Sequence, residues 1–361
     1  MKTKPASSKV PSSIALSKNA LVTKATLSLG ASGLNVHGVF KGSPEVPEKM
    51  IWTASSIKQF RQCPRKFYWK YITRLRQKFG GSALQVGTAF HKCLAEWYRS
   101  NGKIKMEKIA APVAKELGSF LKTHGDFFDN EEKEKLESSI ATFVGMVVGY
   151  AAANDSDRKT LKFDPQIGVE REFLVDCGEF YYAGSIDGLP TVKGKQWLME
   201  HKTASFVNEH YISRLALDTQ SRGYMFAVKA LTGKLPHGVI YNVTQKCKLR
   251  RKCDEKAEDF NRRVAEAYMS EPDKYFYREY IDFDADDIAA FCIELVQTHR
   301  HFMLMAGSQR PLDPRSWTID DSQCNAWFKT CEYHGLCTGG GVSIESSLHL
   351  TQADKLHAEL T

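Results

Sequence analysis

The sequence predicts an α/β fold, in which a mixed central sheet is flanked by helices and extended by further helical segments. Two observations lead to this prediction. Helical segments come first, three alternating segments follow, and another helical segment separates these from a fourth strand and the last helices. The chain has 361 residues, of which 42% are hydrophobic, and this suffices for a packed core in one large or two small domains.

The first 50 residues are predicted to be a disordered basic tail. Residues 1–44 carry six lysines and no acidic residue, so the rest of the chain supplies only +2 of the net charge of +8. A segment rich in Ser, Lys, Ala and Gly without a sustained period is typical of disorder. An organelle presequence is the alternative, although such segments favour arginine. Contacts with nucleic acid are therefore expected from local basic patches rather than from overall charge.

Helices are predicted between residues 53 and 153. The serine pair at 55–56 suits the cap of a short helix, and Pro64 suits the first turn of the next one. Gly87 is expected to open a third helix, with His91 at the flank of its apolar stripe. Residues 104–153 also have the helical period, and four of their apolar residues are expected to be buried: Phe120, Leu136, Phe143 and Val147.

Three strands are predicted at residues 167–175, 180–187 and 196–202, and a turn near Gly194 joins the last two. Side chains alternate between the two faces of a strand. One face of the third strand therefore carries Trp197, Met199 and His201, and the other carries Leu198, Glu200 and Lys202.

The rest of the chain returns to mostly helical patterns. A helix at 213–231 and a strand at 237–243 are followed by helices near 254–270 and 284–305. We expect one domain over residues 51–337, with a helical part at about 100–160, a catalytic core at about 165–245, C-terminal helices and a cysteine cluster at 254–337, and a flexible tail at 338–361.

Two carboxylates and a lysine suggest the chemistry. Glu200 lies thirteen positions after Asp187, and Lys202 follows two residues later on the same predicted strand. Carboxylates bind hard cations such as Mg²⁺, and a bound cation can stabilise the charge that builds up during phosphodiester hydrolysis. Surface salt bridges give the same spacing, but this strand is otherwise apolar, where an unpaired charge is costly to bury. A metal-dependent nuclease is the leading hypothesis.

Five segments, taken in order, carry a resemblance. They are an entry helix at 56–68, a histidine motif at 87–91, two strand motifs at 184–187 and 200–202, and a Gln-x-x-x-Tyr motif at 220–224. This pattern resembles the PD-(D/E)XK nuclease superfamily, and within it the RecB-like exonuclease branch, which includes AddB-like and CRISPR-associated exonuclease-like proteins. The resemblance covers roughly residues 53–337 and implies a restriction-endonuclease-like fold.

The resemblance also implies roles for single residues. Asp187 and Glu200 would bind Mg²⁺ or Mn²⁺, with the His201 backbone carbonyl and a nitrogen of His91 as further ligands. Lys202 would position or activate the attacking water. Gln220 and Tyr224 would orient the lysine or hold the substrate phosphate. Glu170 would be a supporting acid. Outside this context, His91 would be read as a core histidine and Gln220 with Tyr224 as a plain helix-face pair.

The cysteines fall into two groups. Nine cysteines and no secretory apolar segment make a disulfide scaffold unexpected. Cys63 together with Cys324, Cys331 and Cys337 is similar in layout to the [4Fe-4S] ligands of several RecB-like nucleases, although the spacing Cys-x₆-Cys-x₅-Cys is longer than the usual one. Four thiolates also suit Zn²⁺, and plain buried thiols are the third alternative. The others are expected to be packing or surface thiols: Cys93, Cys177, Cys247, Cys253 and Cys292.

Two basic stretches are candidate DNA contacts. Residues 58–78 carry eight Lys or Arg and no acid among several aromatic residues, and residues 246–252 form a second patch. Basic side chains neutralise phosphates, and aromatic rings stack on unpaired bases. The candidates are Arg61, Arg65, Lys66, Lys70, Lys248, Arg250 and Arg251.

The expected function is a Mg²⁺-dependent deoxyribonuclease, most simply an exonuclease in DNA recombination, repair or phage and prophage DNA processing. A catalytically inactive DNA-binding or assembly subunit on the same fold is the alternative, and a redox sensor is a more distant one. Linear or single-stranded DNA is the expected partner. The sequence lacks G-x-x-x-x-G-K-[ST], so unwinding would require a helicase or recombination partner. No run approaching 20 apolar residues is visible, so we expect an intracellular, cytoplasmic protein in a bacterium or phage-infected host, without membrane contact.

Overall fold

The computed structural model describes residues 21–24, 49–77, 82–125, 130–164, 168–307, 313–326, 330–339 and 350–352. Its centre is a mixed seven-stranded sheet in the order β1-β5-β6-β9-β10-β11, with β2 paired to β6. β9 and β10 run parallel, whereas β6 is antiparallel to both of its neighbours, β5 and β9, and β11 is antiparallel to β10. The strands are β1 (Leu21–Lys24), β2 (Ile51–Trp52), β5 (Val169–Asp176), β6 (Tyr181–Gly188), β9 (Leu198–Ala204), β10 (Gly238–Gln245) and β11 (Phe276–Asp282).

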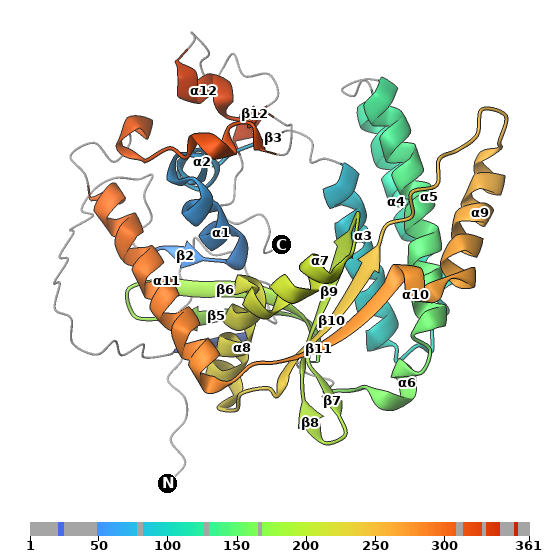
Figure 1. Ribbon diagram of the computed structural model, residues 1–361, viewed down its shortest axis with the longest axis horizontal. Coiled ribbons are helices and arrows are strands. Elements are labelled where there is room, and N and C mark those ends of the chain that lie inside the picture. Colours follow the sequence, from blue (N-terminus) through green and yellow to red (C-terminus); the bar gives the residue numbers. More distant parts are fainter. Residues whose placement is uncertain are drawn as a thin grey trace.

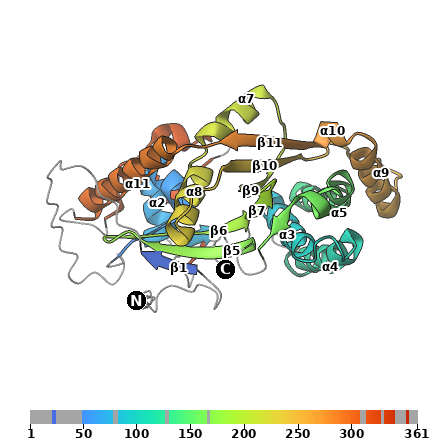
Figure 2. The same ribbon diagram turned by 90° about the horizontal axis from the view of Figure 1, so that it is seen from below.

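Helices gather at two ends of this sheet, and each group closes a core (Figures 1 and 2). One group consists of α1 (Ala54–Gln62), α2 (Pro64–Phe67), α8 (Thr219–Thr232) and α11 (Ala285–Ala306). The other consists of α3 (Ser82–Arg99), α4 (Met106–His124), α5 (Asn130–Ala153) and α9 (Ala257–Ser270). The α/β prediction, with a mixed sheet and flanking helices, is confirmed.

Strand β9 separates the two cores as its alternation predicted. Leu198 packs in the core of α8 and α11, whereas Met199 packs in the core of α3 and α5. His201 lies on the Met199 side, where its ring stacks on Tyr98 of α3 with centroids 5.6 Å apart. Glu200 and Lys202 therefore emerge toward α8 from a strand that is buried on both sides.

Short elements complete the fold. They are a π-helical turn (Tyr68–Ile72), β3 (Leu75–Gln77), α6 (Asp157–Thr160), β4 (Lys162–Phe163), β7 (Pro190–Val192), β8 (Lys195–Gln196), α7 (Glu209–Ser213), a 3₁₀ turn (Arg214–Leu217), α10 (Pro272–Tyr275), 3₁₀ turns at Pro314–Ser316 and Asp321–Gln323, α12 (His334–Thr338) and β12 (Leu350–Gln352). The turn near Gly194 has positive φ at Lys193 and Gly194, which suits the tight hairpin between β7 and β8.

Several details differ from the sequence-based expectations. Helix α3 begins at Ser82 rather than Gly87, because the residues before the glycine also favour helix. Within the two predicted tails, Leu21–Lys24 pairs with β5 and Leu350–Gln352 pairs with β3. The other residues of 1–48 and 340–361 lie outside the described residues. Phe120 is only half-buried, whereas the other three expected core residues of α4 and α5 are buried.

One helix also alters the expectation about membrane-length segments. Residues Lys133–Ala153 of α5 are long and apolar enough to cross a membrane by length and composition, with a mean hydropathy of 1.4 over the best window. Half of that window is buried inside the protein, and Phe143, Met146, Val147 and Tyr150 form part of the core with α3 and α9. This is the burial of a core helix in a globular domain.

Candidate metal centre

The sheet brings three acidic residues together where β6 and β9 meet. Glu170 of β5 comes between the paired positions Val169 and Arg171, which places it beside Asp187 of β6. Glu170 has a φ of 45°, a left-handed conformation that is rare for a residue with a side chain and is often found at functional sites. Gly188 of β6 pairs with Met199 of β9, and Asp187 and Glu200 flank this pair.

His91, Glu170 and Asp187 form a candidate metal-binding cluster. One ligand atom from each residue lies within 4.8 Å of those of the other two. His91 Nδ1 is 3.2 Å from Asp187 Oδ1, and Ser185 Oγ donates to Glu170 Oε2 at 3.2 Å. The backbone amide of His201 donates to Asp187 Oδ2 at 2.7 Å, which fixes this carboxylate between β6 and β9. One imidazole and two carboxylates suit Mg²⁺ or Mn²⁺ with further oxygen ligands from water or substrate.

Opposed charges hold the first two ligands in place. Burial alone would lower the pKa of His91, but the negative charge of Asp187 and their hydrogen bond raise it to about 9. Burial opposes ionisation of Asp187, yet His91 and the His201 backbone amide lower its pKa to about 2. Burial and the charge of Asp187 raise the pKa of Glu170 to about 7. A bound cation would relieve this crowding of acids, so these residues fit a divalent metal.

Glu200 and Lys202 form a second group that adjoins the cluster. Lys202 Nζ donates to Glu200 Oε1 and to Gln220 Oε1, each at 2.8 Å, and lies 3.6 Å from Asp218 Oδ2. Gln220 Nε2 donates to Glu200 Oε1 at 2.7 Å. The other oxygen, Glu200 Oε2, is buried without a hydrogen-bond partner among the described residues. Such an atom is costly unless a ligand satisfies it, and a cation beside Asp187 would do so.

The protonation states of this group follow from its burial. Glu200 is 1% exposed, and burial with the charge of Asp187 raises its pKa to about 8. Burial would lower the pKa of Lys202, but Glu200 and Asp218 raise it above its usual value. Lys202 therefore stays an ammonium group at neutral pH. As an ammonium group it can donate hydrogen bonds to a water or a phosphate.

Helix α8 positions these groups from one side. Asp218 caps its first turn by accepting from the Gln220 amide at 3.2 Å, which directs Gln220 toward Lys202. Tyr224, one turn further, is buried. A Cβ at Gly184 would lie 2.7 Å from the Tyr224 ring, so the glycine allows this close approach of α8 to β6.

The structure thus brings the predicted site residues together. His91 and Asp187 lie in the cluster, while Glu200, Lys202, Gln220 and the His201 backbone adjoin it. The sequence underestimated Glu170, which lies in the cluster itself, and missed Asp218 and Ser185. Glu170 could be recognised as a candidate ligand because it lies beside Asp187 across the β5–β6 pair. This position follows from the register of the two strands, which must be known first.

The predicted DNA-binding residues of the first basic stretch have structural partners. Arg61 Nη1 lies 3.0 Å from Glu294, Arg65 donates to the Trp317 carbonyl, and Lys66 Nζ lies 2.9 Å from Glu332. Lys70 lies over the ring of Tyr71 with its Nζ 5.4 Å from the centroid. Arg61, Arg65 and Lys66 thus hold α1 and α2 against the C-terminal segments.

Some residues of the second basic stretch, 246–252, form hydrogen bonds or ring contacts within the protein. Arg251 Nε donates to the Glu255 carbonyl, and the Arg250 carbonyl accepts from Arg263. Lys248 Nζ lies 5.1 Å from the ring centroid of Phe206, which is 59% exposed. DNA contact by either stretch stays a prediction.

Four cysteines from the two ends of the chain line a cavity of about 10 Å³, which has room for about one water molecule. Cys63 caps α2, where its Sγ accepts from the Lys66 amide at 3.5 Å, and Cys337 Sγ accepts from Trp69 Nε1 at 3.4 Å. Cys324 and Cys331 lie on the other walls. No three of these thiols, all of them described, lie within 4.8 Å of one another. All nine cysteines carry free thiols, and those outside the cavity are Cys93, Cys177, Cys247, Cys253 and Cys292.

A comparison with protein families identifies the class of fold and site. The model of the PD-(D/E)XK nuclease superfamily matches residues 51–338, so the chain belongs to this superfamily. This membership, with the His91–Glu170–Asp187 cluster, supports a hydrolytic nuclease that uses a divalent metal.

Two further comparisons add little to this. No curated protein matches the chain. Among solved structures, the chain is similar to one described as "Crystal structure of SSO0001", with 11% identity, a TM-score of 0.29, and coverage of 71% of this chain and 78% of that one.

Proposed function

We propose that the protein is a metal-dependent deoxyribonuclease of the RecB-like branch that degrades linear or single-stranded DNA from its ends. The observation that carries the proposal is the buried oxygen Glu200 Oε2, which has no described protein partner and adjoins the His91–Glu170–Asp187 cluster. A nuclease centre needs an acidic, partly unsatisfied site of this kind for its cation. Its cellular role would be DNA recombination, repair or processing of phage DNA.

The residues of the centre have distinct tasks in this proposal. His91, Glu170, Asp187 and Glu200 would hold Mg²⁺ or Mn²⁺, and the cation would neutralise charge on the scissile phosphate. Water attacks phosphorus and gives up a proton to solvent, the bond from phosphorus to the 3′ oxygen breaks, and that oxygen takes up a proton, which leaves a 3′-hydroxyl and a 5′-phosphate. Because Lys202 stays protonated, it stabilises the developing negative charge. Gln220 holds the lysine in place through its 2.8 Å contact with Nζ.

We further propose a [4Fe-4S] cluster on Cys63, Cys324, Cys331 and Cys337. A tetrahedral zinc with Zn–S bonds of about 2.3 Å holds its thiolates only about 3.8 Å apart. No three of these thiols are that close, so they do not form a preformed zinc site, and the proposal rests on their layout in the sequence. Because the cavity is small, the thiols would have to move apart to admit the cluster. Such a group would link the start of the domain to its end, which is a structural role.

The test of the nuclease proposal is digestion of end-labelled linear DNA and closed circular DNA side by side, with Mg²⁺ or with a chelator. We expect the linear DNA to be degraded from its ends only with Mg²⁺, and the circular DNA to persist. Cleavage of the circle would establish an endonuclease instead. Binding of DNA without cleavage of either substrate would support an inactive DNA-binding or assembly subunit.

A further inference from the structure

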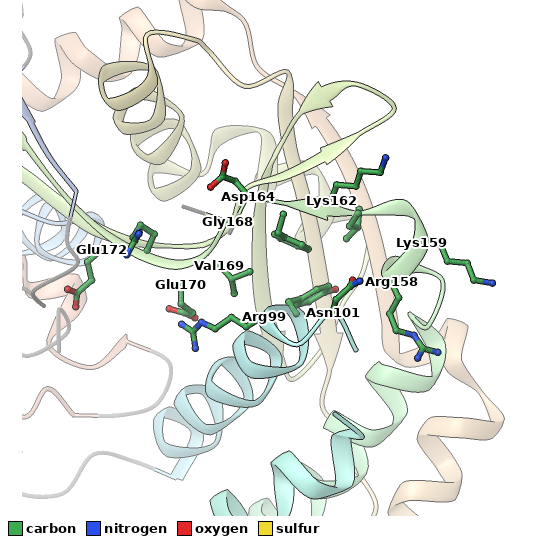
Figure 3. A pocket seen from close by; sticks show the side chains of 14 residues that line it. Arg99, Asn101, Arg158, Lys159, Lys162, Asp164, Gly168, Val169, Glu170 and Glu172 are labelled. Carbon is green, nitrogen blue, oxygen red and sulfur yellow. The ribbon is translucent and has the colours of Figure 1, made fainter. Parts of the chain in front are cut away.

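A large cavity opens beside the metal centre, and the sequence motifs assign it no role. Its volume is about 1050 Å³, at the upper end of the range of small-molecule pockets. It lies between the end of α3, the segment from α6 to β4, and the start of β5 (Figure 3). Glu170 lines this cavity and also belongs to the metal cluster, so the two sites are continuous.

The cavity lining changes in charge along its length. Figure 3 shows Arg99 beside Glu170 near the metal centre, while Arg158, Lys159 and Lys162 lie at the opposite end. Five of the lining residues are cationic, namely Arg99, Arg158, Lys159, Lys162 and Arg171. Three are acidic: Glu170 at the metal centre, Glu172 at the end away from Lys159, and Asp164. The cationic side chains outnumber the acids and dominate the end that lies away from the metal cluster.

Two of these cations are available for a ligand. Arg158 is already engaged, because it forms an ion pair with Asp155 and donates to the Gly102 carbonyl at 3.5 Å. Lys159 and Lys162 are exposed, and within the described ranges neither has an acidic partner. Basic side chains at one end and a cation site at the other suit a ligand with a repeated negative charge, such as a nucleic acid strand.

We propose that this cavity holds the backbone of the substrate strand next to the scissile phosphate, with Lys159 and Lys162 contacting its phosphates. The inference rests on the proposed nuclease function, because the scissile phosphate must lie at the His91–Glu170–Asp187 cluster. The cavity then supplies affinity and direction for the strand and leaves the chemistry to the metal centre. Phosphate contacts of this kind position a strand without reading its sequence.

The test compares wild type with the double variant Lys159→Glu/Lys162→Glu. The matched control is Lys108→Glu/Lys115→Glu, two exposed lysines on α4 that do not line the cavity. Binding of a labelled single-stranded oligonucleotide is measured by anisotropy at several salt concentrations, with Ca²⁺ in place of Mg²⁺ to slow cleavage. Hydrolysis of bis(p-nitrophenyl) phosphate with Mg²⁺ reports on the metal centre alone, because this diester is too small to span the cavity.

We expect the cavity variant to bind the oligonucleotide roughly tenfold more weakly than the control, with a salt slope smaller by about 1.4, or about 0.7 for each lost contact. Its hydrolysis of the small diester should equal that of wild type. If wild type cleaves DNA but the cavity variant binds like the control, the cavity assignment is wrong and the nuclease function stands. If the cavity variant loses equal fractions of its activity on DNA and on the small diester, the cavity assignment is also wrong. If wild type cleaves neither substrate, the nuclease proposal and this inference both fail.

Discussion

The metal centre and the four-cysteine cavity lie in the same chain, but their ligands come together by different routes. Asp187 and Glu200 reach the centre on hydrogen-bonded neighbouring strands, and His91 Nδ1 lies 3.2 Å from Asp187 Oδ1. The cysteines come from residue 63 and from residues 324–337, and no three of these described thiols approach within 4.8 Å. The first site is therefore held by the register of the sheet, whereas the second depends on segments from the two ends of the chain that meet at one small cavity.

The strongest way to break this comparison is to disturb the centre of the preformed site with Asp187→Asn. The amide keeps the shape of the side chain but removes the charge that attracts His91 and a cation. We expect DNA cleavage to fall by at least about 10²-fold, since charge stabilisation at a reacting phosphate is lost. The rate of cleavage with saturating Mg²⁺ is the measurement, and the exposed Asp254→Asn is the control. Cleavage within a few-fold of wild type would place the metal elsewhere.

A second change tests whether Glu170 is a direct ligand. Glu170→Gln removes the charge of one of the three candidate ligands, so we expect the affinity for Mn²⁺ to fall by more than the roughly 10–100-fold that losing an outer-shell partner costs. Calorimetric titration with Mn²⁺ measures this directly. The control is Glu179→Gln, an exposed acid in the turn between β5 and β6. Unchanged Mn²⁺ affinity would reduce Glu170 to a neighbour of the site.

The substitution Cys63→Ser tests whether the four-cysteine cavity holds a metal centre. If the four thiols hold an iron-sulfur cluster, wild type prepared without oxygen is brown, and the variant loses the visible absorption and part of its iron. Binding energy in such sites is also folding energy, so the melting temperature should fall by several degrees. The control is Cys253→Ser, an exposed thiol outside the cavity. A colourless wild type with stoichiometric zinc, or with no metal, would contradict the cluster assignment.

The last prediction concerns stability rather than activity, in the core that joins the cysteine end to the sheet. His299 is buried, and its Nδ1 accepts from Trp52 Nε1 at 3.3 Å, so burial lowers its pKa from 6.5 to about 4. The unfolded chain takes up this proton first as the pH falls. The stability contributed by neutral His299 is therefore complete above about pH 6.5 and is lost toward pH 4, by up to about 3 kcal/mol.

Denaturant titrations between pH 4 and pH 7 measure this effect on the free energy of unfolding. His299→Gln retains an acceptor for Trp52 but cannot titrate, so its stability should change less over this range. The same slope in both proteins would assign the acid sensitivity to other groups.

The sequence predicted the centre better than its surroundings. Strand alternation and helical period are local signals, and they place Asp187, Glu200, Lys202 and Gln220 on their strands and helix. The order of the five motifs along the chain then indicates that these residues belong to one site. Glu170 required the register of β5 against β6, and Asp218 required the position of the first turn of α8. Both positions depend on tertiary structure, which local sequence patterns do not specify.

The missed strand β11 shows the same limit. Phe276–Asp282 has its apolar residues in pairs, separated by charged residues, so it lacks the strict alternation that identifies a half-buried strand. Arg278 of this strand pairs with buried Asp157 at 2.6 Å, a contact across 121 positions of the chain. Local patterns cannot predict such a pair, and the cavity between α6 and β5 depends on elements that are just as far apart.

The central claim is that a preformed acidic centre with a protonated lysine cleaves phosphodiesters. The most direct measurement is single-turnover cleavage of end-labelled linear DNA by wild type and by Lys202→Ala at saturating Mg²⁺, with Lys234→Ala as an exposed control. The account predicts that Lys202→Ala is slower by about 10²–10³-fold while the control matches wild type. Equal rates for Lys202→Ala and wild type would contradict it.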